Sequence, residues 1–162
     1  MENLLTILNN KSLLMALAAI GSTALAYTML NFEYGLLSFA GLSGTATIDR
    51  GHKLYNERCS SCHGLHLEGQ PNWKNPLPSG RLPAPPHDQS GHTWHHDDIA
   101  LIDIIKLGLR PFVGETYESD MPAFGTTLRD EEIIAIISYI ESTWPDRERM
   151  YQQQITRQTN SK

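Results

Sequence analysis

Cys59-Ser60-Ser61-Cys62-His63 contains both cysteines of this 162-residue chain. The spacing C-x-x-C-H is typical of the covalent attachment of a c-type haem. Two cysteines three residues apart on a helical turn can form thioether bonds to the two haem vinyl groups. The next residue, His63, is then held under the iron, where its imidazole can be the proximal axial ligand. The motif therefore predicts one covalent haem c, attached through Cys59 and Cys62 and ligated by His63.

Three other uses of a C-x-x-C pair explain the motif less well. A thioredoxin-like redox pair is typical of a βαβ context, and this chain has no convincing strand pattern. A structural zinc site needs further cysteine or histidine ligands, which only histidines of the later loops could supply. A lone disulfide between Cys59 and Cys62 would close a tight loop of little stabilising use.

Three helices are predicted around the motif. The first covers about residues 48–58 and leads directly into the two cysteines. The second covers about residues 97–107, begins with two aspartates that suit a helix N-terminus and carries a stripe of isoleucines. The third covers about residues 130–143, has an acidic first turn and a clear apolar face, and is stopped by Pro145.

Long loops separate the predicted helices. Residues 64–91 are rich in proline and glycine, and residues 110–128 form a second connection without a helical pattern. Three short helices with long loops bury little apolar surface for a domain of this length. We therefore predict an all-α fold wrapped round an internal prosthetic group, which the motif identifies as haem.

An apolar segment lies near the N-terminus. Residues 12–30 carry no charge over 19 residues, with Lys11 before them and Glu33 after them. Roughly 20 residues are needed for a helix to span a bilayer. The segment is either an uncleaved membrane anchor or a signal peptide cleaved after Ala26, and in both cases the rest of the chain is exported. A buried core helix of a cytosolic protein is the third alternative.

The patterns divide the chain into four regions. These are a signal peptide or membrane-anchor helix at residues 1–30, a linker at 31–47, a haem domain at 48–144 and a polar tail at 145–162. Because the tail is polar and rich in glutamine, we expect it to be frayed or disordered.

Composition excludes several classes of protein. The net charge of −5, with 40% hydrophobic and 19% charged residues, fits neither a wholly disordered chain nor a multi-span membrane protein. Two cysteines cannot form a disulfide framework or a four-cysteine zinc site. No basic patch dominates, so we expect no nucleic-acid partner.

Three local patterns between residues 48 and 144 resemble those of a monohaem class I cytochrome c. Gly51-x-x-x-Tyr55-x-x-x-Cys59 is similar to the family's N-terminal helix, in which a glycine permits close approach of the C-terminal helix. Met121-Pro122-x-Phe124 resembles the family's distal-ligand motif. The sequence Asp130-Glu131-Glu132-Ile133, with Tyr139 further on, resembles the start of the helix that crosses the first one. The resemblance implies the class I cytochrome c fold behind an N-terminal hydrophobic helix.

Met121 is the predicted sixth ligand of the haem iron. It is the only methionine between the haem motif and the third helix, and it follows His63 by 58 residues, enough chain to wrap round the haem. Thioether sulfur is a soft ligand that favours Fe(II), and Pro122 stiffens the loop that carries it. The alternatives are an open site, a methionine that only fills the core, or a histidine ligand from the set His52, His66, His87, His92, His95 and His96.

Residues 87–98 gather four histidines and three aspartates. This loop is either a second metal site, for copper or zinc, or an ordered loop beside the haem whose imidazoles bond backbone groups or haem propionates. His95 and His96 are adjacent, and on a helix their side chains would point about 100° apart, which disfavours a shared metal.

Other residues are candidates for contacts around the haem. Arg81 and Trp94 can donate hydrogen bonds to haem propionates. In the family that this chain resembles, a proline carbonyl in the loop after the motif orients the ligating histidine. Pro71 and Pro76 are both candidates for that carbonyl.

The resemblance implies a one-electron carrier rather than an enzyme, because both axial positions are filled and no acid, base or nucleophile is grouped for catalysis. Its partners are then other redox proteins, on the periplasmic side of a bacterial inner membrane or in the periplasm. The alternative is a haem-bearing subunit through which electrons enter a respiratory oxidase or dehydrogenase complex. A haem gas sensor is a third possibility. The identity of the donor and acceptor, the redox potential and the oligomeric state are left open.

Overall fold

The computed structural model describes residues 44–114 and 116–161. The hydrophobic helix predicted at residues 12–30 lies outside the described residues, as does most of the linker. Among the residues that are described, no helix combines the length and the apolar character that crossing a membrane requires.

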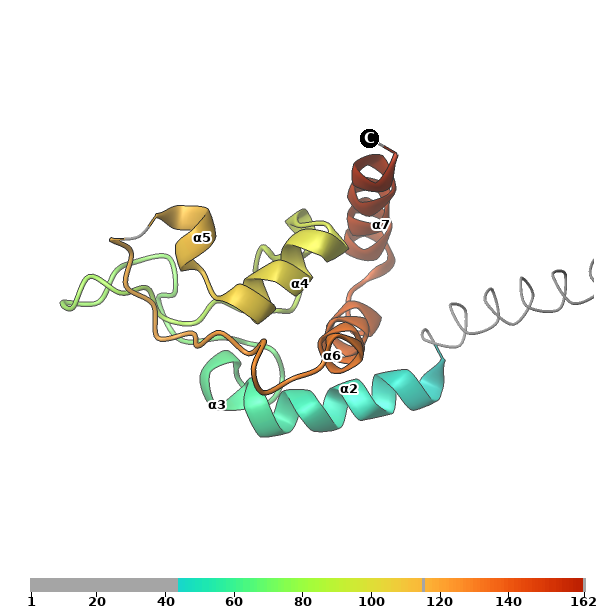
Figure 1. Ribbon diagram of the computed structural model, residues 1–162, viewed down its shortest axis with the longest axis horizontal. Helices are drawn as coiled ribbons and strands as arrows, with labels where there is room; N and C mark the ends of the chain where they lie inside the picture. The colour runs from blue at the N-terminus through green and yellow to red at the C-terminus, as the bar shows by residue number, and fades with distance from the viewer. Residues whose placement is uncertain (1–43, 115, 162) are drawn as a thin grey trace, which may run out of the picture. The chain divides into compact units, whose positions relative to one another are not determined.

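The described part of the chain is all helix and loop, with no strand, as the sequence predicts (Figure 1). Its elements are α2 (Thr45–Arg58), α3 (Ser60–His63), the 3-10 helix η1 (Thr93–His95), α4 (Asp98–Leu107), α5 (Arg110–Val113), α6 (Asp130–Ser142) and α7 (Asp146–Asn160). Three of them, α2, α4 and α6, correspond to the predicted helices. The one-turn helix α5 lies in the segment 110–128 that we expected to be a loop throughout.

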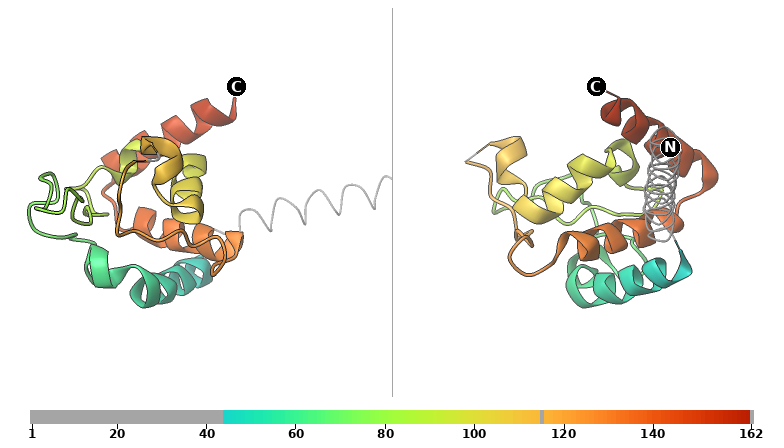
Figure 2. Two further views of the ribbon diagram at one scale, coloured as in Figure 1. Left: turned by 60° about the vertical axis from the view of Figure 1, so that its left-hand side comes forward. Right: turned by 45° about the vertical axis from the view of Figure 1, so that its right-hand side comes forward.

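The core of the fold lies where α6 crosses α2 (Figure 2). The apolar face of α6 is fully buried, and Tyr55 of α2 is 0% exposed. Buried side chains of this core are Tyr55, Leu67, Leu101, Leu128, Ile133, Ile136, Ile137, Ile140 and Trp144. At Gly51 of α2, a Cβ would lie 1.9 Å from the carbonyl oxygen of Ala135 in α6. A glycine therefore permits this crossing, as the resemblance implied.

Polar side chains cap the N-termini of α4 and α6. The carboxylate of Asp97 caps α4 by accepting a hydrogen bond from the backbone N–H of Ala100 at 2.9 Å. At the start of α6, the carboxylate of Glu132 accepts from the backbone N–H of Arg129 at 3.0 Å. Acidic residues fill the first turn of α6, where they are favoured by the helix dipole.

The polar tail forms a helix, so the expectation that it is disordered was wrong. Over its 15 residues, α7 buries Glu148 and Gln152 and contacts η1. Thr156 and Thr159, further along the same face, are partly buried. Polar side chains hold this face: the side-chain nitrogen of Gln152 donates to the carboxylate of Asp98, and the Thr156 hydroxyl donates to the same oxygen at 3.1 Å.

Candidate haem-binding site

The two cysteines of the motif lie at the junction of α2 and α3. Cys59 is the residue that ends α2, where its backbone N–H donates to Tyr55 O at 2.8 Å, and Cys62 lies one turn later in α3. Both are free thiols, so they form no disulfide with each other. Cys62 is exposed and Cys59 is half-buried. Burial raises the pKa of the Cys59 thiol to about 11, and the nearby Cys62 adds to the shift.

His63, the last residue of α3, has one ring nitrogen fixed by a hydrogen bond. Its Nδ1–H donates to the carbonyl oxygen of Pro85 at 2.8 Å. Burial lowers the pKa of His63, and the bond to Pro85 offsets part of that shift. The ring is therefore neutral at physiological pH, with Nδ1 as the donor and Nε2 carrying a free lone pair. This is the state in which an imidazole binds a metal.

Pro85 supplies the carbonyl that we expected from Pro71 or Pro76, so that expectation was wrong. The segment after the motif folds back onto residues 84–88: Gln70 N–H donates to Ala84 O at 2.8 Å, and His87 N–H donates to Leu67 O at 2.7 Å. Both expected prolines are exposed.

A close backbone approach selects Pro85 among the prolines of this loop. Gly69 has a φ of +68°, and a Cβ there would lie 2.4 Å from Pro86 N. Only glycine gives the loop this approach at low cost, and it carries the Pro85 carbonyl to the ring of His63.

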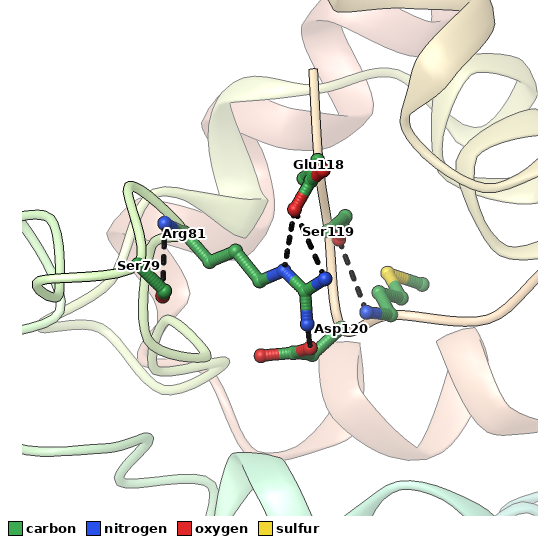
Figure 3. Close-up of polar contacts among 6 residues, drawn as sticks. Ser79, Arg81, Glu118, Ser119 and Asp120 are labelled. Carbon is green, nitrogen blue, oxygen red and sulfur yellow. Dashed lines mark hydrogen bonds and ion pairs between the residues drawn. The ribbon is translucent and has the colours of Figure 1, made fainter. Parts of the chain in front are cut away.

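Met121 is half-buried in the loop between α5 and α6. Its backbone N–H donates to the hydroxyl of Ser119 at 3.0 Å (Figure 3). Arg81 reaches this loop from the proline-rich segment and pairs with two of its carboxylates, Glu118 at 3.0 Å and Asp120 at 2.6 Å. Figure 3 shows the guanidinium between the two carboxylates. Arg81, proposed above as a propionate donor, thus ties the loop of Met121 to the loop that follows the haem motif.

Trp94, the other proposed propionate donor, lies in η1 with its indole nitrogen Nε1 buried. Among the described residues, this N–H has no hydrogen-bond partner. A buried donor without an acceptor is costly, so the indole fits a site in which a further acceptor binds.

The histidine-rich loop does not gather metal ligands. No group of three or more histidine, cysteine, aspartate or glutamate side chains in the described residues could hold a metal ion. The rings stack on other rings instead: His92 on Trp73, with centroids 5.4 Å apart, and His95 on Trp94, with centroids 3.7 Å apart. This arrangement corresponds to the ordered loop, the alternative to a second metal site.

Several apolar side chains of α5 and of the proline-rich loop are exposed. Phe112 and Val113 of α5 are 49% and 54% exposed, and Leu77 and Leu82 of the loop are 44% and 43% exposed. Large apolar side chains left in water are available to an apolar ligand or partner. Two free cysteines followed by a neutral, oriented histidine fit a haem.

Comparison with known families decides the identity of the fold. A family model for cytochrome c matches residues 48–144, more than half of the chain. The chain belongs to the cytochrome c family. Comparisons with curated proteins and with solved structures gave no significant match.

Membership of the family establishes the chemistry in outline. The cytochrome carries a covalently bound c-type haem and takes part in haem-based electron transfer. A single cytochrome c domain is consistent with a single haem. α7 begins after the matched residues end.

Proposed function

We propose that this cytochrome is a one-electron carrier whose haem is attached at Cys59 and Cys62 and ligated by His63 and Met121. The observation that carries the proposal is the 2.8 Å bond from His63 Nδ1 to Pro85 O, directly after two free cysteines. With Nδ1 committed to the carbonyl, Nε2 is the nitrogen left for the iron. The haem, when bound, supplies an Fe(III)/Fe(II) couple, whose potential is raised by a methionine ligand.

The protein's own residues hold the two proposed ligands. The Pro85 carbonyl keeps the His63 imidazole in one tautomer and one orientation. The backbone bond to Ser119 and the ion pairs of Arg81 restrain the loop of Met121. An electron carrier needs little movement at its ligands, because each change of geometry adds to the barrier for electron transfer.

An optical spectrum of the matured protein tests the ligand assignment. We expect a low-spin c-type spectrum with a weak far-red sulfur-to-iron band in the oxidised form. Met121→Ala removes this band and allows carbon monoxide to bind the reduced protein. Met150→Ala is the matched control, because Met150 lies in α7 and is 66% exposed.

Four results would contradict the assignment. A low-spin wild-type spectrum without the band would move the sixth ligand to a histidine. A high-spin wild-type spectrum, or carbon monoxide binding to reduced wild type at neutral pH, would favour sensing or catalysis. A Met121→Ala spectrum equal to wild type would remove Met121 from the iron.

We infer further that the carrier works on the exported side of a bacterial inner membrane, between other redox proteins. The uncharged residues 12–30, preceded by Lys11, support this location. Cell fractionation tests it: an anchored protein stays with the membranes until detergent is added, and a protein cleaved after Ala26 is released from the periplasm. Recovery from the cytoplasm would contradict it, and recovery only within an oxidase or dehydrogenase complex would favour a subunit role.

A further inference from the structure

A second histidine lies flat against the proposed haem ligand. The rings of His87 and His63 have centroids 4.0 Å apart and planes 24° apart. The edge of the His63 ring at Nδ1 is already bonded to Pro85 O. His87 therefore covers one face of an imidazole whose edge is fixed by a residue only two positions earlier.

The position of His87 is set by the core, independently of His63. Its Nδ1 lies 2.8 Å from the hydroxyl oxygen of Thr93, which is buried. Its backbone carbonyl accepts a hydrogen bond from the indole nitrogen of Trp144 at 2.7 Å, and its N–H donates to Leu67 O at 2.7 Å. Both Trp144 and Leu67 are core residues at 3% exposure. The His87 ring is thus a rigid surface against which another ring can rest.

A buried hydroxyl group fixes one edge of the His87 ring. The Thr93 hydroxyl points its hydrogen towards Pro86 O at 3.5 Å, so its oxygen is available to accept from His87 Nδ1–H. The His87 ring is therefore held at its own Nδ1 while its face rests on His63.

One hydrogen bond does not fix the plane of an imidazole. A ring bonded only at Nδ1 can still swing about the line from that nitrogen to its acceptor, and water can reach both of its faces. A flat contact at 4.0 Å removes the swing towards that side and covers that face.

We propose that His87 is a positioning residue for His63, which sets the rotation of the ligating imidazole and shields one face of it from water. This inference rests on the proposed role of His63 as an axial ligand. It gives His87, a member of the histidine-rich loop, a role other than metal binding or propionate binding.

Two variants distinguish the effect of the flat His87 ring from the effect of its hydrogen bond to Thr93. His87→Asn retains a nitrogen donor near the position of Nδ1 for Thr93 but has no ring. His87→Phe retains a flat ring and lacks the nitrogen. Both are compared with wild type as matured haem proteins by nuclear magnetic resonance. The oxidised form reports the haem methyl shifts, which depend on the plane of the axial imidazole, and the reduced form reports exchange of the His63 Nδ1–H with solvent.

We expect His87→Asn to change the pattern of haem methyl shifts and to speed exchange of the His63 Nδ1–H about tenfold. We expect His87→Phe to stay close to wild type in both measurements. The sulfur-to-iron band should persist in both variants, which shows that the opposite ligand is intact. If His87 had only a structural role, both variants would be less stable, but they would not differ from each other in methyl shifts and His63 exchange.

The proposal is overturned if His87→Asn keeps the wild-type methyl pattern and exchange rate. If His87→Asn does not fold, Thr93→Val takes its place, because it frees the His87 ring without removing it. The expected result is then faster His63 exchange, and an unchanged rate overturns the proposal. A wild-type His63 with no paramagnetic shift in the oxidised protein is a different failure, since it removes His63 from the iron and refutes the proposed function itself.

Discussion

Gly51 is the residue on which the crossing of α2 and α6 depends. The atoms that a Cβ would meet there are the backbone oxygen and carbon of Ala135, at 1.9 and 2.5 Å. Backbone atoms inside a helix cannot rotate away, so the two helices would have to separate. Tyr55, one turn after Gly51, is buried in the same interface and donates from its hydroxyl to Gly64 O at 2.8 Å. Because Gly64 directly follows His63, the crossing also fixes the end of the haem motif.

Substitution of Gly51 should therefore destabilise the whole domain. We expect Gly51→Ala to lower the free energy of unfolding by about 1–3 kcal/mol, the usual cost of overpacking a core. Denaturant unfolding of the matured protein measures it. Glu57→Ala is the control, because Glu57 lies at an exposed position of the same helix and the change introduces alanine without a close contact. Equal losses in the two variants would show that the helix crossing tolerates the methyl group.

Single residues also show where prediction from sequence stops. The roles of Gly51 and the motif follow from local spacing, because a helix places residues at fixed intervals. The partner of His63 does not follow from spacing, since it depends on which of several carbonyls the loop brings near. Gly69 makes that choice through a contact with Pro86, 17 residues away in the chain. The stacking of His87 on His63 also depends on how this loop folds back, so the sequence did not predict it.

Among the elements, Arg81 joins the proline-rich loop to the loop that carries Met121. Its guanidinium donates to Glu118 from both Nε and a terminal nitrogen, at 3.2 and 3.0 Å, and to Asp120 at 2.6 Å. Such forked pairing is geometrically specific, although the side chains are exposed and the ion pairs are screened by salt. We infer that the pairing holds the loop of Met121 in place.

Loss of the Arg81 pairing should let the Met121 loop open more often. We expect Arg81→Gln to accelerate displacement of Met121 by added imidazole about two- to fivefold at low salt, and less at high salt. Loss of the sulfur-to-iron band over time reports the rate. Arg147→Gln is the control, because Arg147 lies in α7 and its side chain is 84% exposed. A rate equal to wild type at low salt would show that the ion pairs do not restrain the loop.

α7 shows why an element can escape prediction altogether. Its inward face includes residues 148, 152, 156 and 159, which have helical spacing and are polar, and Ile155 is its one partly buried apolar residue. An apolar stripe is the signal that marks a helix packed on a core, and α7 lacks one. Its partners are Asp97 and Asp98 at the start of α4, which accept hydrogen bonds from Thr159 and Thr156 at 3.1 Å. Only the folded structure shows that these polar groups complement one another.

Across the domain, α4, α6 and α7 meet at two neighbouring acids that are partly buried. Glu141 of α6 lies beside Asp98 of α4, and Gln152 of α7 donates to the same aspartate. One carboxyl oxygen of Glu141 is buried without a partner among the described residues. Burial raises the pKa of Glu141 to about 8, and the charge of Asp98 contributes to the shift. At neutral pH, Glu141 is therefore protonated, and its O–H can donate to Asp98.

The protonated Glu141 makes the stability of the fold depend on pH. In the unfolded chain this carboxyl loses its proton near its ordinary pKa of 4.5, whereas the folded chain keeps the proton up to about pH 8. Between these values the folded state binds more protons, so the free energy of unfolding falls as pH rises. The total fall from this group is on the order of a few kcal/mol. Above pH 8, a charged Glu141 beside Asp98 weakens the junction of the three helices.

Glu141→Gln isolates this effect, because glutamine is neutral at every pH and can still donate to Asp98. We expect the variant to gain stability relative to wild type as pH rises from 5 to 9, with most of the gain reached by about pH 8. Denaturant unfolding of both proteins across this range measures the difference. Glu57→Gln, at an exposed position of α2, should show no such gain. If Glu141→Gln and wild type keep a constant difference from pH 5 to 9, then Glu141 ionises alike in both states, and the junction carries no bound proton.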